Sequence, residues 1–182
     1  MSILVNNAGI GGPVADLVDI DTGSWDEVFD VSVRGRSFRA GPSCLPCRAF
    51  LPAMVERREG DVINLASVTG KRPLRGGTPY AVSKMAVIGL TTTLAFEVGE
   101  AGVRVNSLSP GPVRGERMAG RFAREAERTG HSVDDVTKEF VSRAALGRML
   151  EEDEVARAEV AMLQMPGLTG ADIDLSAGMI GR

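Results

Sequence analysis

Four short apolar segments, each followed by residues that form turns, restrict the possible folds of this sequence more than any other feature. They lie at residues 2–6, 62–66, 103–108 and 171–175. Each has the length of a buried strand and is too short to be a helix. Stretches with helical spacing of apolar residues separate them, so each connection must cross back over the sheet. We therefore predict an α/β fold with a parallel sheet of about four strands and helices on both faces.

The helices expected between these strands have recognisable starts and stops. Thr22 or Ser24 can cap a helix that runs to Val33 and packs against the sheet. Glycine and proline interrupt the pattern over 34–46, before it resumes at 49–55. Thr78-Pro79 is a helix-start signal, and Gly102 a stop signal. The remaining helical patterns are a long apolar one at 80–100, a polar one at about 116–143 and an amphipathic one at 152–163.

Composition excludes several classes of protein. The chain has 182 residues, enough for a single domain over 1–182, with 43% apolar and 25% charged residues and a net charge of −3. Arginines are scattered among acids, so no nucleic-acid partner is expected. We find no run of about 18 apolar residues, and no basic N-terminal region leading into an apolar stretch. We therefore expect no membrane partner and a cytoplasmic location.

The two cysteines, Cys44 and Cys47, have the C-x-x-C spacing of redox and zinc sites. A zinc site needs about four ligands, and the only histidine, His131, is distant in the sequence. A thioredoxin-like pair would open a helix directly after a strand, whereas this pair lies in the Gly-Pro-rich interruption. We predict two ordinary reduced cysteines and no metal site.

Tyr80 and Lys84 are four residues apart in a predicted helix, so their side chains project from the same face one turn apart. Lowering the pKa of a phenol from about 10 to about 7 requires about 4 kcal/mol. One positive charge about 4 Å away, at an effective dielectric of about 20, supplies about that much. The pair can therefore act as a general acid/base. The alternative is a tyrosine with a polar tip and a solvated lysine.

Ser67 lies at the end of the predicted strand 62–66, thirteen residues before Tyr80. Ligands of parallel sheets bind outside the carboxyl ends of the strands. The Ser67 hydroxyl can there hydrogen-bond a substrate oxygen that Tyr80 protonates or deprotonates. The three side chains together predict proton transfer to or from an alcohol or carbonyl oxygen.

Four ordered motifs resemble those of the short-chain dehydrogenase/reductase family, whose fold is Rossmann-like. They are Asn6-Asn7-Ala8-Gly9, Asn64-Leu65-Ala66-Ser67, Tyr80-Ala81-Val82-Ser83-Lys84 and Asn106-Ser107-Leu108-Ser109-Pro110-Gly111. The resemblance implies that Tyr80 is the catalytic acid/base and that Ser67 positions the substrate oxygen. It also implies that Lys84 lowers the tyrosine pKa and, with Tyr80, contacts the nicotinamide ribose.

The same resemblance implies a nucleotide cofactor, NAD or NADP. Asn6, Ala8 and Gly9 would lie along its adenosine part, and Pro110, Gly111 and Val113 near its nicotinamide. Taken singly, these residues are also common in turns and at strand ends. Ser32 stands where the family usually has an asparagine that holds a proton-relay water, so we also count it as a catalytic candidate.

The family's Thr-Gly-x-x-x-Gly-x-Gly turn, which brings backbone amides to the cofactor pyrophosphate, has no counterpart in this sequence. Relative to the family, the chain begins at the fourth strand. We therefore expect the C-terminal half of the fold, an N-terminally truncated family member, and weak binding of NAD or NADP by the chain alone.

Two functions remain open from the sequence. The first is an oxidoreductase that interconverts an alcohol and a carbonyl by hydride transfer to or from NAD(P), acting on a small-molecule alcohol or ketone. The second is a non-catalytic remnant that serves as an oligomerisation or interaction partner. In either case the resemblance implies a homo-oligomer formed through the helices at 49–55 and 80–96.

Overall fold

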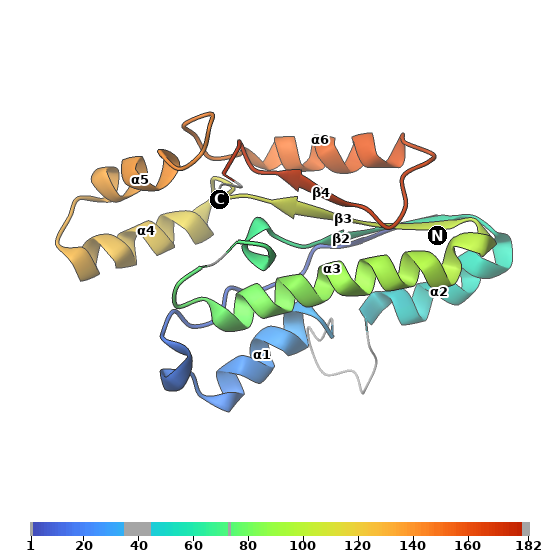
Figure 1. The fold of residues 1–182 in the computed structure, drawn as a ribbon, viewed down its shortest axis with the longest axis horizontal. Helices are drawn as coiled ribbons and strands as arrows, with labels where there is room; N and C mark the ends of the chain where they lie inside the picture. Colours follow the sequence, from blue (N-terminus) through green and yellow to red (C-terminus); the bar gives the residue numbers. More distant parts are fainter. Residues whose placement is uncertain (1, 35–44, 73, 180–182) are drawn as a thin grey trace.

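The computed structural model of the chain describes residues 2–34, 45–72 and 74–179. Its core is one sheet with the strand order β1 (Ile3–Asn6), β2 (Gly60–Leu65), β3 (Val103–Pro110) and β4 (Asp172–Leu175). All three strand pairs are parallel, with Asn6 opposite Asn64 and Leu65 opposite Leu108. The predicted α/β fold and the positions of its four strands are confirmed. Figure 1 shows the sheet between two layers of helices.

Helices α2 (Leu45–Arg57) and α3 (Thr78–Val98) cover one face of the sheet, and α6 (Glu152–Leu163) covers the other. On the first face Leu4, Val62 and Val105 pack against Met54 and Ala95. The second core consists of side chains from β2, β3 and α6: Ile63, Leu65, Leu108 and Met162. Residues of one strand alternate between these two cores, as the two-residue period of a strand requires.

Helix α1 (Thr22–Ser32) differs from its predicted cap and packing. Its N-cap is Asp21, whose carboxylate accepts a hydrogen bond from the Ser24 amide at 2.9 Å. A carboxylate is an equally good cap, and it also complements the positive end of the helix. The helix packs mainly against α3, with Val28 completely buried, where the sequence predicts packing on the sheet.

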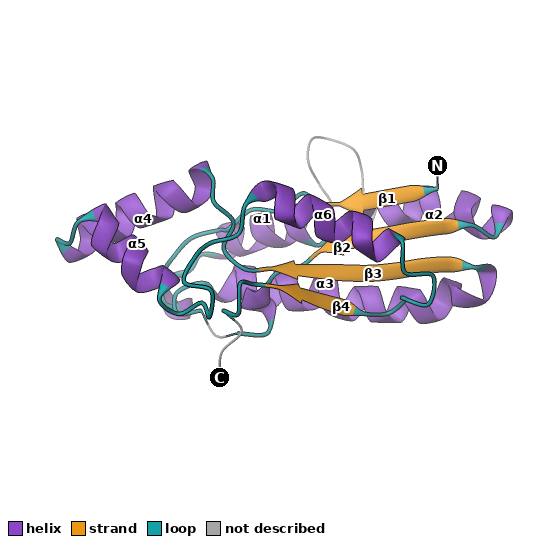
Figure 2. Cartoon of the chain, turned by 90° about the horizontal axis from the view of Figure 1, so that it is seen from above, coloured by secondary structure: helices purple, strands orange, loops and turns teal. Residues whose placement is uncertain are grey.

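The polar region after β3 forms two helices, α4 (Glu116–Thr129) and α5 (Val133–Val141). Gly130 ends α4 in the left-handed conformation, and the Ser132 hydroxyl caps α5 by accepting from the Asp135 amide. Seen from above, both helices lie beyond the carboxyl ends of the strands (Figure 2). They therefore stand next to the place where ligands of parallel sheets bind.

Three short 3₁₀ turns complete the described structure: η1 (Leu17–Asp19), η2 (Val68–Gly70) and η3 (Gly99–Ala101). The last of these extends α3, and together residues 78–101 are long and apolar enough to cross a membrane, with a mean hydropathy of 1.3. The sequence analysis looked for an uninterrupted apolar run and did not identify this segment, because Lys84 and Glu97 interrupt it. The apolar side chains have a role within the fold, because α3 packs along the sheet and buries Val87 and Ala95.

Turn η2 lies so close to α3 that only glycine fits at position 70. A Cβ atom there would lie 2.9 Å from the Met85 nitrogen and 3.0 Å from the Lys84 carbonyl carbon, both backbone atoms. The end of β2 is thus held against the first turns of α3. This contact fixes the distance between Ser67, which caps η2, and Tyr80 in α3.

We predict that Gly70→Ala lowers the free energy of unfolding by about 1–3 kcal/mol, because backbone atoms have to move apart to admit the methyl group. Urea unfolding followed by circular dichroism measures the change. Gly99→Ala is the matched control, since a Cβ at position 99 meets nothing within 4 Å. Equal stability of the two variants would contradict the close approach.

Candidate active site

Tyr80 and Lys84 are both buried, in the first two turns of α3. Their exposed fractions are 9% and 4%. The lysine Nζ lies 5.8 Å from the centroid of the tyrosine ring and donates a hydrogen bond of 2.7 Å to the carbonyl oxygen of Leu65 at the end of β2. Tyr80 and Lys84 thus lie side by side, as predicted. The hydrogen bond from Lys84 to Leu65 connects the pair to the sheet.

The electrostatics favour the ionised phenol. Burial raises the pKa of Tyr80, but the positive charges of Lys84 and Arg117, with hydrogen bonds from Arg117 and Ser67, outweigh it and bring that pKa below 10.0. Burial lowers the pKa of Lys84, and the charge of Arg117 adds to this effect. The site therefore contains a tyrosine prepared to exchange a proton.

Ser67 follows β2 directly, and its side chain lies close enough to Tyr80 to lower the pKa of the phenol. Its hydroxyl also accepts a hydrogen bond of 3.2 Å from the Thr69 amide, which caps η2. This cap fixes the direction of the side chain. Ser67, Tyr80 and Lys84, from the end of one strand and the start of one helix, are thus brought together.

Gly9 and Ser32 lie on the other side of Lys84. A Cβ atom on Gly9 would stand 3.1 Å from the lysine Nζ and 3.6 Å from the Ser32 hydroxyl oxygen. That hydroxyl accepts a hydrogen bond of 3.4 Å from the Ile10 amide. The loop after β1 therefore passes close to the lysine ammonium, and a side chain at position 9 would crowd it.

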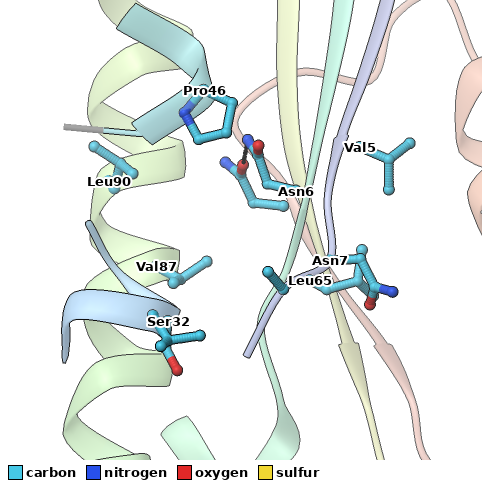
Figure 3. A pocket seen from close by; sticks show the side chains of 11 residues that line it. Val5, Asn6, Asn7, Ser32, Pro46, Leu65, Val87 and Leu90 are labelled. Carbon is cyan, nitrogen blue, oxygen red and sulfur yellow. Dashed lines mark hydrogen bonds between the residues drawn. The ribbon is translucent and has the colours of Figure 1, made fainter. Parts of the chain in front are cut away.

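Asn6 and Ala8 line a cavity of about 160 Å³ between β1, α1, α2 and α3, together with Ser32, Pro46 and Leu90 (Figure 3). The Asn6 amide nitrogen donates to Asn64 at 2.7 Å and to the sulfur of Cys47 at 3.3 Å. Among the described residues, its amide oxygen is buried without a hydrogen-bond partner. The Asn6 side chain is thus directed into the cavity.

Three further candidates lie at the ends of β3 and β4. The Gly111 amide donates to the Leu175 carbonyl at 2.7 Å, and a Cβ on Gly111 would stand 3.0 Å from the Ser176 Cα. Val113 pairs with Leu150 in an isolated bridge, and Pro110 is the last residue of β3. This stretch forms a wall at the same carboxyl edge, without a described contact to Tyr80.

The cysteine prediction is tested for Cys47, which is buried and free; Cys44 lies outside the described residues. Burial raises the pKa of Cys47, so its thiol is less reactive than an ordinary one. Among the described residues, no group of three or more His, Cys, Asp and Glu side chains could hold a metal ion.

Sequence reasoning missed Arg117, at the start of α4. Its guanidinium carbon lies 5.1 Å from the centroid of the Tyr80 ring. Tyr80 and Arg117 belong to helices that are distant in the sequence, so no helical spacing relates them. The only available signal was the position of Arg117 just after a strand end, where ligands of parallel sheets bind.

The geometry agrees with comparisons to known proteins. The model of the short chain dehydrogenase family matches residues 1–126. The chain is 36% identical to (+)-borneol dehydrogenase 2 of Salvia officinalis, over 88% of this chain and 54% of that protein. It is 30% identical to 2-(S)-hydroxypropyl-CoM dehydrogenase 3 of Xanthobacter autotrophicus, over 97% of this chain and 65% of that protein.

Solved structures agree in fold. An actinorhodin polyketide ketoreductase with NADPH matches all of the chain and 68% of its own, with a TM-score of 0.88 and 25% identity. A 4-hydroxyisoleucine dehydrogenase mutant complexed with NADH and succinate matches 98% of the chain and 68% of its own, with a TM-score of 0.82 and 25% identity. The chain belongs to the short-chain dehydrogenase family. It spans roughly half to two thirds of the length of these two curated relatives.

We predict that Lys84→Met raises the pKa of Tyr80, because the positive charge with the largest stabilising effect on the phenolate is removed. Tyr80 is the only tyrosine, so the ultraviolet absorbance of tyrosinate during a pH titration reports this residue alone. Lys138→Met, on α5, removes the same charge from an exposed position and is the control. An unchanged midpoint in Lys84→Met would show that the ammonium does not act on the phenol.

Proposed function

We propose that this chain carries the proton-transfer centre of an NAD(P)-dependent oxidoreductase that interconverts an alcohol and a carbonyl compound. The observation that carries the proposal is the buried Tyr80 next to the buried Lys84, with Ser67 on the same tyrosine. The dehydrogenases and reductases among its relatives support the class of reaction. The substrate oxygen would lie between the hydroxyls of Ser67 and Tyr80.

Each side chain has a separate part in the reaction. In reduction, the Tyr80 hydroxyl gives its proton to the carbonyl oxygen while the Ser67 hydroxyl hydrogen-bonds that oxygen. In oxidation, the tyrosinate takes the alcohol proton. Lys84 and Arg117 keep the ionised tyrosine accessible by their charge. When bound, the nicotinamide supplies or removes the hydride, which balances the electrons of the step.

The described residues fit the nicotinamide half of a dinucleotide better than its pyrophosphate half. The Lys84 ammonium has three donors, and Leu65 accepts one of them in the structure. The remaining donors of the Lys84 ammonium could bind a ribose diol beside Tyr80. Gly9 and Gly111 have no side chains that would keep a ligand away from the backbone. Within residues 2–34, 45–72 and 74–179, no strand leads through a G-x-G-x-x-G turn into a helix.

Ser32 and the cavity beside it fit a relay of protons toward Lys84. The Ser32 hydroxyl lies next to Gly9, and Ser32 lines the cavity together with Asn6 and Asn64. A cavity of about 160 Å³ with these polar groups has room for water molecules that bridge them. We assign Ser32 to this relay, in the position where the family uses asparagine.

A homo-oligomer is the assembly that we propose, through α2 and α3. Their exposed apolar side chains are Phe50, Val55, Val82, Met85 and Phe96. Phe96 is 92% exposed, an unusual state for a phenylalanine on a helix that otherwise covers the core. A symmetric contact between two copies of α3 would cover it. A location in the cytoplasm fits the same proposal.

Replacing Tyr80 by phenylalanine tests the proposed function. We expect Tyr80→Phe to lower turnover 10²–10⁴-fold, as loss of a general acid/base does, with the thermal midpoint little changed. Steady-state rates are measured for the 182-residue chain at high cofactor concentration and for the chain joined to the glycine-rich N-terminal units of a family member. Phe96→Tyr is the control, because it changes one hydroxyl on an exposed aromatic ring outside the site and leaves Tyr80 in place. More than about a tenth of the activity in Tyr80→Phe would refute the assignment.

We further predict that the 182-residue chain alone binds NAD or NADP with a dissociation constant of about a millimolar or weaker. The pyrophosphate anchors of a dinucleotide site contribute several kcal/mol, and about 4 kcal/mol separates micromolar from millimolar binding. Titration calorimetry with both nucleotides on folded protein measures it. Binding tighter than about 50 μM would show that these residues complete a cofactor site by themselves.

A further inference from the structure

Several arginines of the described structure form an ion pair with a carboxylate. Arg104, Arg114, Arg148 and Arg157 each have one within 2.9 Å, at Asp61, Glu151, Glu154 and Asp153. Arg117 and Arg121 differ. Within the residues that the structure describes, no carboxylate lies within ion-pair distance of either guanidinium. Arg117 is the one of these two that lies over the Tyr80 ring, and Arg121 follows it on α4.

Arg117 stands directly beside the proposed acid/base. Its guanidinium carbon lies 5.1 Å from the centre of the Tyr80 ring, and its charge lowers the pKa of the phenol. A Cβ on Gly11 would be 4.0 Å from the Arg117 Nε, so the guanidinium lies between α3 and the loop that follows β1. A substrate whose oxygen touches Tyr80 must therefore pass within reach of this group.

Arg121 lies one helical turn farther along α4, on the same side as Arg117. Its guanidinium carbon lies 5.7 Å from the centre of the Phe140 ring. Burial lowers the pKa of Arg121, and the neighbouring charge of Arg117 lowers it further. Glu125 is the acidic group near Arg121, but it makes two hydrogen bonds to Arg128, at 3.0 and 2.6 Å. The repulsion between Arg117 and Arg121 therefore remains without a compensating ion pair.

Two guanidinium groups one helical turn apart, neither in an ion pair with a carboxylate of the described residues, can bind an anion from outside the protein. Their planar donors match the two oxygens of a carboxylate, which they bind in a bidentate manner. We propose that Arg117 and Arg121 form an anion subsite next to Tyr80, and that the alcohol or carbonyl compound handled here carries a carboxylate close to its reacting carbon. This proposal rests on the proposed function for the reaction, but the anion subsite can be tested without turnover.

The first experiment uses the 182-residue chain and no cofactor. A carboxylate on Arg117 places negative charge near the phenol, so it must raise the pKa of Tyr80. Malonate is the probe, sodium chloride at equal ionic strength is the reference, and tyrosinate absorbance gives the midpoint. We expect malonate to raise the midpoint by about half a unit or more relative to chloride. Circular dichroism at each pH confirms that the protein stays folded.

The variants identify the residue responsible. In Arg117→Met the midpoint without malonate is higher than in the wild type, and malonate has no more effect than chloride. Arg117→Lys keeps the charge and retains part of the response. Arg157→Met, on α6, removes an exposed arginine that pairs with Asp153 and responds like the wild type. An equal malonate effect in wild type and Arg117→Met overturns the proposal.

The second experiment measures turnover of short oxo acids and of their methyl esters. The protein assayed is the 182-residue chain joined to the glycine-rich N-terminal units of a family member. Arg117→Met also changes the Tyr80 pKa, so the informative quantity is the ratio of kcat/KM for acid over ester, in which that effect cancels. We expect the ratio to fall at least about 10-fold in Arg117→Met and by a smaller factor in Arg121→Met.

The two experiments separate the possible failures. Turnover of acids and esters with a ratio that Arg117→Met leaves unchanged would overturn the carboxylate subsite while the oxidoreductase function stands. A malonate response that depends on Arg117, without turnover of any compound, would support the subsite and refute the proposed reaction.

Discussion

The ammonium group of Lys84 is the charge around which the candidate site is arranged. It is 4% exposed, and no carboxylate among the described residues forms an ion pair with it. Burying a cation without a counter-ion is costly, and proteins seldom retain one for stability alone. Here the Leu65 carbonyl accepts one hydrogen bond from the ammonium, and the charge lowers the pKa of the Tyr80 phenol.

Two glycines make this arrangement possible. Gly9 lets the loop after β1 pass within van der Waals distance of the ammonium, and Gly70 lets η2 lie against the backbone of Lys84 and Met85. Backbone therefore surrounds the lysine on three sides. The three segments are the loop after β1, the end of β2 and the 3₁₀ turn η2. Backbone cannot move as a side chain does, so the distance between Ser67 and Tyr80 is fixed by the fold itself.

The local parts of this structure could be predicted from the sequence, and the tertiary parts could not. Strand positions followed from short apolar runs, and α6 occupies the predicted residues because its amphipathic pattern is regular. Tyr80 and Lys84 were predictable because their spacing is helical. The cap and the packing of α1 were not, since Asp21 competes with Thr22 and Ser24, and packing on α3 depends on tertiary contacts. Arg117 reaches Tyr80 only through the placement of α4 beyond the sheet.

The positive charges of Lys84 and Arg117 both stabilise the ionised phenol of Tyr80, but they repel each other. Arg117 lowers the pKa of Lys84, whereas the tyrosine raises it. Ionisation of Tyr80 therefore reduces the repulsion between the two cations, which lowers the pKa of the phenol. An anion bound by Arg117 would cancel part of that field and return the tyrosine toward its protonated form. In the proposed subsite the substrate's own charge would thus help to determine how readily Tyr80 donates its proton.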